Sequence, residues 1–175
     1  MRAGAAAALV GCLALALGGL AATVAGPPPP PATDGWQTFE GAWSATGRRF
    51  PLEFEGGGTA VVVEFSGAVV VKAGSGLSHG FQGRLIGFDD GQGLSTGRAV
   101  WTDGHGDRIY SRLRGERLEA GTRLVGTITG GTGRYAGIDG EYTFTWQYMV
   151  PGEDGTFEVR ASNLSGRYRR AGASP

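Results

Sequence analysis

The sequence predicts an all-β protein built as a closed, antiparallel, eight-stranded barrel. Short runs alternate between apolar and polar residues with a period of two, as strands do when one face is buried. Glycine supplies 34 of the 175 residues and, with other turn residues, bounds these runs. No stretch long enough for a helix combines apolar spacing of three and four with freedom from glycine, which weakens a helix by about 1 kcal/mol relative to alanine.

Four segments are expected along the chain. Arg2 precedes a long apolar run, and small residues precede a cleavage position after Ala25, which is typical of a secretory signal peptide. Five consecutive prolines then predict a stiff linker. The expected segments are a signal peptide at 1–25, a Pro-rich linker at 26–35, the β-barrel domain at 36–168 and a disordered tail at 169–175. The predicted location is periplasmic or extracellular.

Two alternatives for the N-terminus remain open. The apolar run is long enough to serve as an uncleaved N-terminal membrane anchor. Residues 9–12 are similar to a lipoprotein box in which Cys12 would be lipidated, but the apolar run continues beyond Cys12 where a polar linker would be expected. If the signal is cleaved, no stable membrane insertion is expected.

Composition excludes several classes of site. Cys12 is the only cysteine, so the mature domain has no disulfide framework, cysteine-ligated metal or cysteine nucleophile. We expect neither a metal nor a cofactor. Net charge is zero and the two signs are interleaved, which argues against a nucleic-acid partner because such proteins concentrate basic residues on one surface.

The expected strands are short, regularly spaced and separated by turn residues. They cover 39–45, 49–54, 60–65, 68–72, 79–88, 96–102, 107–118, 123–129, 141–150 and 156–168. Pro51 suggests an edge position or a strand start, because proline has no backbone N–H. Closure into a barrel is favoured because an open sheet would leave edges that can pair with other chains.

One strand, 141–150, presents an aromatic face. An eight-stranded barrel has an interior just wide enough for side chains or for one small ligand. We therefore expect aromatic side chains to surround a small apolar molecule in the lumen. The candidate ligand-binding residues are Trp101, Tyr142, Phe144, Trp146 and Tyr148.

Residues 129–142 contain five glycines around Arg134 and Tyr135, which raises the question of a phosphate-binding loop. Such a loop needs a helix after it, whose N-terminus holds the anion. Here the following residues alternate as a strand. The segment is therefore interpreted as a tight corner between two strands, in which glycine allows positive φ and close backbone approach.

The same segment carries a family resemblance. Residues 128–142, ITGGTGRYAGIDGEY, resemble the signature of the allene oxide cyclase and dirigent-type barrels, with a Gly-Gly-x-Gly run before an aromatic residue and a later glycine. The similarity continues through a turn at Pro151 into a last strand. Residues 97–103, with Gly106 and Asp107, resemble exported bacterial relatives of that barrel. The resemblance implies an eight-stranded barrel whose lumen, in the plant proteins, holds an oxylipin or a phenolic radical pair.

Two further patterns have simple structural interpretations. Residues 103–107, DGHGD, begin like a calcium loop but lack the later glycine and glutamate that such a loop needs, so a hairpin turn is expected. Arg108, Tyr110, Arg112 and Arg114 share one face of a strand. Because Ile109 and Leu113 occupy the opposite face and would point inward, the arginine face is expected on the barrel exterior.

Three functions are consistent with this sequence. The first is an exported barrel that binds a small hydrophobic ligand in its lumen. The second is an enzyme, a cyclase or isomerase acting on a hydrophobic substrate inside the barrel. The third is a filled barrel with a structural or surface role. The resemblance carries no catalytic residue over to this chain, and oligomeric state is left open.

Overall fold

The computed structural model describes residues 35–171 apart from 93–94, 119–120 and 153–154. The expected signal peptide, nearly all of the linker and residues 172–175 therefore lie outside the described residues. The elements are β1 (Gln37–Phe54), β2 (Gly58–Val71), β3 (Gly80–Asp89), β4 (Ser95–Asp103), β5 (Arg108–Leu118), β6 (Gly121–Gly131), the 3-10 helix η2 (Gly133–Tyr135), β7 (Ile138–Thr145), β8 (Tyr148–Pro151) and β9 (Thr156–Arg170).

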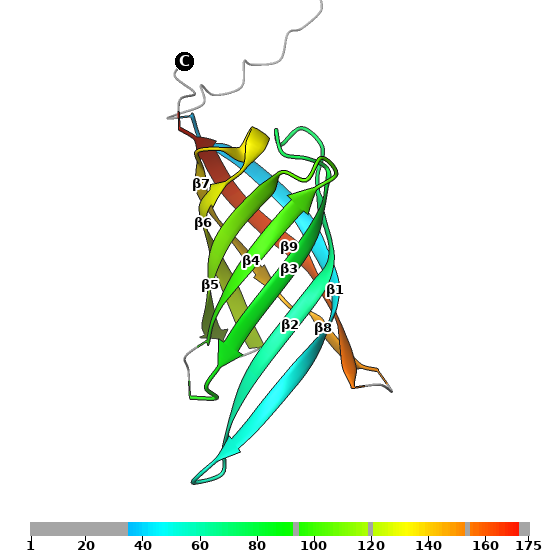
Figure 1. The fold of residues 1–175 in the computed structure, drawn as a ribbon, viewed down its shortest axis with the longest axis vertical. Helices are drawn as coiled ribbons and strands as arrows, with labels where there is room; N and C mark the ends of the chain where they lie inside the picture. The colour runs from blue at the N-terminus through cyan, green and yellow to red at the C-terminus, as the bar shows by residue number, and fades with distance from the viewer. Residues whose placement is uncertain (1–34, 93–94, 119–120, 153–154, 172–175) are drawn as a thin grey trace, which may run out of the picture. The chain divides into compact units, whose positions relative to one another are not determined.

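Eight strands close into an antiparallel barrel (Figure 1). Strands β1 to β7 pair in chain order, each with the next. Strand β9 pairs with β7 on one edge and with β1 on the other, which joins the two ends of the sheet. The predicted fold class, a closed eight-stranded antiparallel barrel, is confirmed, and β8 is one strand more than the barrel needs.

Two of the expected strand breaks are absent. Residues 46–48 and 66–67 stay within β1 and β2, and all of them are paired in the β1–β2 ladder. A Cβ at Gly67 would lie 2.0 Å from the backbone oxygen of Ser44. Glycine therefore allows the two strands to approach closely at this point without interrupting their pairing.

The strand expected over 141–150 is divided in the structure, so that expectation was wrong. Residues 146–147 belong to neither β7 nor β8. Strand β1 occupies one edge of β9, so β7 and β8 share the other edge, pairing with residues 165–170 and 157–160 respectively. The chain therefore leaves the barrel sheet at 146–147 and resumes pairing farther along β9.

A bulge in β9 accounts for this division. Between the pairs Gly41–Leu164 and Trp43–Ala161, β1 has one intervening residue and β9 has two. The extra residue of β9 lies next to the gap between β7 and β8. Side chains replace the missing ladder bonds. The backbone N–H of Thr145 donates to Oδ1 of Asn163 over 3.0 Å, and that of Ser162 donates to Oε1 of Gln147 over 3.1 Å.

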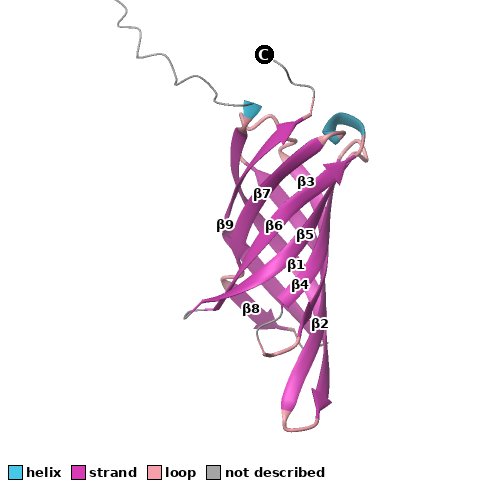
Figure 2. Ribbon diagram, turned by 90° about the vertical axis from the view of Figure 1, so that its left-hand side faces the viewer, coloured by secondary structure: helices cyan, strands magenta, loops and turns pink. Residues whose placement is uncertain are grey.

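Strands β1 and β2 continue beyond the barrel as a two-stranded hairpin, visible past one end in Figures 1 and 2. Strand β9 pairs with β1 only as far as Arg48, and β3 pairs with β2 only as far as Val61. Pro51 lies in the projecting part of β1, where one edge has no partner strand among the described residues. The expected edge position of Pro51 is confirmed.

The glycine-rich segment 129–142 forms a corner. Strand β6 leads into the single turn of η2, and β7 follows, so a strand and not a long helix comes after the glycines (Figure 2). Gly133 and Gly137 have φ of 52° and 71°, in the left-handed region that favours glycine. A Cβ at Gly133 would also lie 1.8 Å from Oδ1 of Asp107. The interpretation as a corner is confirmed.

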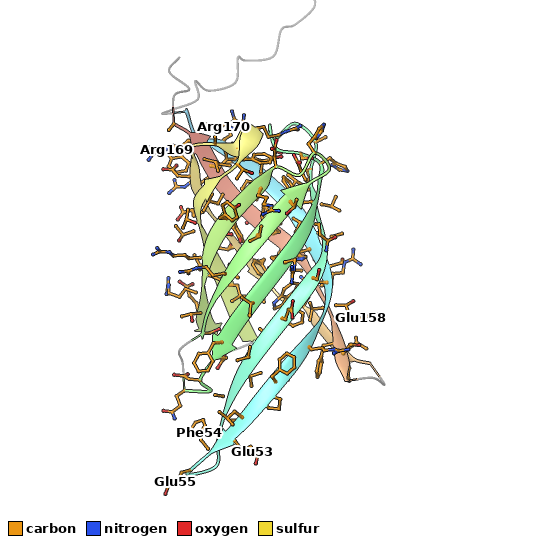
Figure 3. All side chains as sticks on the ribbon, viewed as in Figure 1. Glu53, Phe54, Glu55, Glu158, Arg169 and Arg170 are labelled. Carbon is orange, nitrogen blue, oxygen red and sulfur yellow. The ribbon has the colours of Figure 1, made fainter. Side chains whose placement is uncertain are left out.

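The last strand is longer than expected. Arg169 and Arg170 were assigned to the tail 169–175, but both belong to β9. Figure 3 shows them at the barrel end opposite the β1–β2 hairpin. Arg169 Nε donates to Asp139 Oδ1 over 2.9 Å, and Arg170 donates to the carbonyl oxygen of Gly76 over 3.1 Å. These contacts hold the strand against its neighbours past the expected end.

Strand β5 shows how alternation divides core from surface. Ile109 and Leu113 are 0% and 5% exposed inside the barrel. Arg108, Arg112 and Arg114 are exposed on its outside. The prediction that the arginine face forms the barrel exterior is confirmed.

Candidate functional site

The interior of the barrel has a filled half and a hollow half. The filled half lies toward the end that carries η2, at the top of Figure 1. Its aromatic side chains are at most 4% exposed and are Phe39, Trp43, Phe81, Trp101, Tyr135, Tyr142, Phe144 and Tyr168. Neighbouring ring centroids lie 4.8 to 6.3 Å apart, mostly in tilted or edge-to-face pairs, as in a well-packed aromatic core.

Glycines on the inner wall make room for these rings. A Cβ at Gly83 would lie 2.9 Å from the Trp43 ring, and one at Gly126 would lie 2.3 Å from the Tyr142 ring. Each ring therefore packs directly against backbone that has no side chain of its own. This close contact fills the lumen to its wall in this half of the barrel.

Tyr135 closes the filled end. Its side chain is 0% exposed, and its ring centroid lies 5.7 Å from that of Phe81. Its hydroxyl donates to Oδ2 of Asp103 over 3.0 Å. Burial, together with this hydrogen bond, raises the pKa of Tyr135 to about 12. The corner formed by the glycine-rich segment thus places the buried aromatic ring of Tyr135 at the end of the lumen.

Asp103 is the buried acceptor of this end. Its side chain is 0% exposed, and its Oδ1 accepts the backbone N–H groups of His105 and Asp107 at 2.8 and 3.1 Å. Arg134 Nε lies 3.4 Å from Asp103 and 3.4 Å from Asp107. Burial by itself would raise the pKa of Asp103, but these hydrogen bonds, the Tyr135 hydroxyl and the guanidinium bring it below its usual value.

The segment 103–107 is therefore a hairpin turn between β4 and β5, as predicted. The Asp103 carboxylate accepts backbone N–H groups of the same turn, and the carboxylates of Asp103 and Asp107 both lie close to the guanidinium of Arg134. Arg134 Nη2 also lies 2.8 Å from Nδ1 of His105. Within the described residues, no three His, Cys, Asp or Glu side chains are grouped closely enough to hold a metal ion.

The hollow half lies toward the β1–β2 hairpin. It contains a cavity of about 620 Å³. The apolar side chains that point into it are Val61, Val63, Phe65, Leu85, Leu113, Leu124 and Trp146. The cavity extends from the aromatic core to Thr59 and Gly91, which are both exposed, so it reaches the surface at this end of the barrel.

Two glycines explain why this half is hollow. Gly87 and Gly97 lie directly opposite each other in the β3–β4 ladder, at positions whose side chains would point inward. Val63 lies opposite Gly87 on the other side, in the β2–β3 ladder. In contrast to Gly83 and Gly126, neither of these glycines has an aromatic ring among the atoms nearest to it. At Gly87 and Gly97 the inner wall therefore has no side chain, and no aromatic ring from elsewhere in the barrel fills the space.

The five candidate ligand-binding residues lie at different depths. Trp101, Tyr142 and Phe144 are each 1% exposed and pack together in the filled half. Trp146 is half-buried and lines the cavity, with its ring 5.0 Å from Phe144. The side chain of Tyr148 lies outside the described part of the structure. Whether these five residues contact a ligand stays a prediction.

Trp146 joins the two halves of the lumen. Its ring centroid lies 5.5 Å from Trp43 in the core and 5.6 Å from Phe65 in the cavity wall. It follows the last residue of β7, where the chain leaves the barrel sheet. The interruption between β7 and β8 therefore places a half-buried indole at the floor of the cavity.

Sequence reasoning did not single out most of the cavity wall. Val63, Leu85, Leu113 and Leu124 are ordinary aliphatic residues, and alternation marks them only as inward-facing. What distinguishes them is their position beside Gly87 and Gly97, which depends on strand register. Sequence could have indicated an unfilled layer only if the pairing of the two glycines had been known.

A buried polar pair lies in the core. The hydroxyls of Ser111 and Tyr142 are 2.8 Å apart, and both residues are at most 2% exposed. Burial raises the pKa of Tyr142 well above its usual value, and the hydrogen bond to Ser111 opposes that shift. Both hydroxyls are therefore neutral across the physiological range, and each satisfies the other.

The charged residues of the cavity wall are Arg49 on β1 and Asp89 on β3. Arg49 is exposed and its guanidinium lies 5.6 Å from the centre of the Phe157 ring. Asp89 Oδ1 accepts the backbone N–H of Gly91 at 2.7 Å. Arg49 is exposed and Asp89 forms the last pair of the β2–β3 ladder toward the hairpin, so both charges lie on the solvent-accessible side of the wall.

Fold and cavity together define a class: a closed antiparallel β-barrel with one filled and one hollow half. The chain matches no family model, and no curated protein or solved structure is significantly similar to it. The resemblance to allene oxide cyclase and dirigent-type barrels stays a prediction. Among the described residues, no helix has the length and apolar character required to span a bilayer.

Proposed function

We propose that this protein is exported and binds a small apolar molecule in the cavity of its barrel. The observation that carries the proposal is the cavity itself, about 620 Å³ in volume and walled mainly by aliphatic and aromatic side chains. Ligand sites are typically about 300 to 1,000 Å³, mostly apolar and supplied with a few polar groups. This cavity has those properties, with its charged groups on the solvent-accessible side of the wall.

Shape supports a binding role over a purely structural one. A barrel whose role is mechanical gains stability from filling its lumen, since each empty volume forfeits packing contacts. The filled half achieves such packing with aromatic rings. The hollow half instead combines Gly87 and Gly97 with a wall of moderate-sized side chains.

The distribution of polar groups favours a binder over an enzyme. General acid–base chemistry requires titratable groups that converge on the reacting atoms. The charged wall residues Arg49 and Asp89 lie on the solvent-accessible side, while the deep wall around Leu113 and Trp146 is apolar. An apolar ligand would therefore be held by burial of its surface, about 25 cal/mol for each Å² removed from water.

The proposal is tested with a neutral fluorescent probe, N-phenyl-1-naphthylamine, titrated into the protein. We expect saturable binding with a blue-shifted emission. Val63→Trp should weaken binding at least tenfold, because Val63 lines the cavity opposite Gly87 and the indole would occupy the hollow layer. Native mass spectrometry of the protein purified from its own host should then reveal the natural ligand.

Val62→Trp is the matched control. Val62 is the adjacent residue of β2 and points to the outside, where it is 38% exposed. This variant should bind the probe like the original protein. The proposal would be overturned if the original protein bound no probe at saturating concentrations, or if both substitutions weakened binding equally.

A further inference from the structure

Arg49 belongs to the lumen-facing side of β1. Side chains two residues apart on a strand point to the same face, and Arg49 continues the series that begins with the buried residues Trp43 and Ala45. Its cross-strand partner in the β1–β2 ladder is Val63, which lines the cavity. Arg49 is therefore a cationic residue of the cavity wall, whereas its neighbour Arg48 belongs to the outer face of the barrel.

An aromatic ring holds the guanidinium of Arg49 on this inner side. The central carbon of the guanidinium lies over the Phe157 ring, 5.6 Å from the ring centre. Phe157 lies opposite Gly47 in the β1–β9 ladder, and it is partly buried against the aromatic core. A guanidinium is attracted to the face of a ring, and its five N–H groups remain able to donate to a second partner.

The positive charge of Arg49 has no acidic partner among the described residues. Arg49 takes part in none of the ion pairs found there. The next acid on the same face of β1 is Glu53, at the tip of the β1–β2 hairpin (Figure 3). Four residues at about 3.4 Å each place it about 14 Å along the strand. That separation exceeds the screening length of about 8 Å at physiological ionic strength, so Glu53 does not neutralise Arg49.

The acid of the cavity wall, Asp89, has a structural role of its own. Its Oδ1 accepts the backbone N–H of Gly91 at 2.7 Å, at the turn that follows β3. An aspartate that accepts a backbone N–H two residues farther along the chain stabilises a turn. Asp89 is therefore explained by local structure. Arg49 is not, because it lies within a strand and its charge is unpaired.

We propose that the ligand of the cavity carries an anionic head group, which Arg49 binds while the apolar body of the ligand occupies the hollow half. This inference rests on the proposed function and narrows the ligand to an anionic amphiphile. A guanidinium binds carboxylate, phosphate or sulfonate oxygens through two parallel N–H donors. The head group stays on the solvent-accessible side of the wall, because moving an ionised group into the apolar part would be costly.

The same arrangement disfavours a cationic head group. Arg49 would repel it, and one carboxylate oxygen of Asp89 is already engaged by Gly91. A neutral ligand would fill the apolar part of the cavity equally well but would leave Arg49 without a partner. The charge of the wall therefore selects among ligands of similar size and hydrophobicity.

Two probes with the same apolar body test the proposal. N-phenyl-1-naphthylamine is neutral, and 1-anilinonaphthalene-8-sulfonate adds a sulfonate to the same ring system. The measurement is the ratio of their dissociation constants from fluorescence titrations. The original protein should bind the sulfonate about fivefold more tightly. Arg49→Gln should bring the ratio to about one, and Arg49→Lys should retain a preference for the anion.

Arg48→Gln is the matched control, because it removes the same charge from the adjacent residue on the outer face. It should leave the ratio unchanged. Added NaCl should lower the preference of the original protein for the sulfonate, because salt screens the contact with Arg49.

Displacement of the neutral probe identifies the head group. Dodecanoate, monododecyl phosphate and dodecanol share one chain, and both anions should displace the probe better than the alcohol does. The stronger of the two anions distinguishes a carboxylate ligand from a phosphate ligand.

Several outcomes would overturn this inference alone: equal binding of the two probes by the original protein, equal loss of preference in the Arg48 and Arg49 variants, or displacement by dodecanol as strong as by both anions. In each case the neutral probe still binds, so the proposed function stands. If neither probe binds, the proposed function itself fails, and this inference fails with it.

Discussion

The hydroxyl of Tyr135 donates a hydrogen bond to the buried carboxylate of Asp103 over 3.0 Å. The two residues are 32 positions apart, with Asp103 at the end of β4 and Tyr135 in η2, both at the filled end of the barrel. Through this bond the glycine-rich corner between β6 and β7 is attached to the β4–β5 turn. The filled end of the lumen is thereby closed, whereas the cavity reaches the surface at the end that carries Thr59 and Gly91.

Loss of this bond should destabilise the fold. Tyr135→Phe keeps the ring in the core but removes one donor from a carboxylate that is 0% exposed. We expect the free energy of unfolding to fall by about 1 to 3 kcal/mol. Urea denaturation measures it. Tyr110→Phe, at a half-exposed tyrosine on β5, is the control and should change stability by less than about 0.5 kcal/mol. Equal effects of the two would contradict the assigned role.

Stability should depend on Asp103 in acid. The pKa of Asp103 is lowered in the folded protein from its ordinary value of 3.8. The stabilisation is therefore complete above that value and is lost as the pH falls from there toward the folded pKa. Asp103→Asn should cost about 2 kcal/mol at neutral pH and should flatten the fall in stability below about pH 4.

Denaturation curves recorded across that pH range check this prediction. Asp139→Asn provides a comparison, because Asp139 also pairs with an arginine but is half exposed. Exposed ion pairs contribute only about 0 to 1 kcal/mol. The prediction fails if the acid dependence of the Asp103 variant equals that of the original protein.

A methyl group on the inner wall should disturb the aromatic core. Gly126→Ala would place a Cβ 2.3 Å from the Tyr142 ring, so ring or strand must move. We expect a loss of about 1 to 3 kcal/mol in unfolding free energy. Gly80→Ala, on β3 with no atom within 4 Å of the added Cβ, should be neutral or slightly stabilising. Similar thermal midpoints for the two variants would rule out close packing at Gly126.

The buried hydroxyl pair should behave as a coupled unit. Ser111→Ala leaves the Tyr142 hydroxyl buried without its partner, at a cost of about 1 to 3 kcal/mol. Tyr142→Phe should cost a similar amount. The double variant should cost at least about 1 kcal/mol less than the sum, because it leaves no unpaired donor. Strict additivity in urea denaturation would show that the two hydroxyls do not interact.

Local alternation predicts much of this fold. The arginines of β5 lie outside and Ile109 lies inside because successive side chains point to opposite faces of a sheet, whatever the register. The positive φ at Gly133 and Gly137 belongs to the corner that their segment predicts. Pro51 lies at an edge for the equally local reason that it has no N–H to donate.

Register and bulges are decided between strands, and local sequence did not predict them. The bulge in β9 and the division of the expected strand 141–150 depend on how Asn163 and Gln147 replace ladder bonds across β7, β8 and β9. The alternation of inward and outward side chains within one strand does not depend on the register between that strand and its neighbour. The sequence pattern therefore gave one continuous aromatic strand where the structure has two.

The sequence by itself determined that the chain forms strands, which side chains face the interior, and that the glycine-rich segment is a corner. Only the tertiary structure decided that the lumen is half filled. That property arises because register places Gly83 against Trp43 and Gly126 against Tyr142, but places Gly87 opposite Gly97 with no ring between them. The same glycine content makes a packed core in one half of the barrel and a cavity in the other, because the outcome depends on which residue faces each glycine across the barrel.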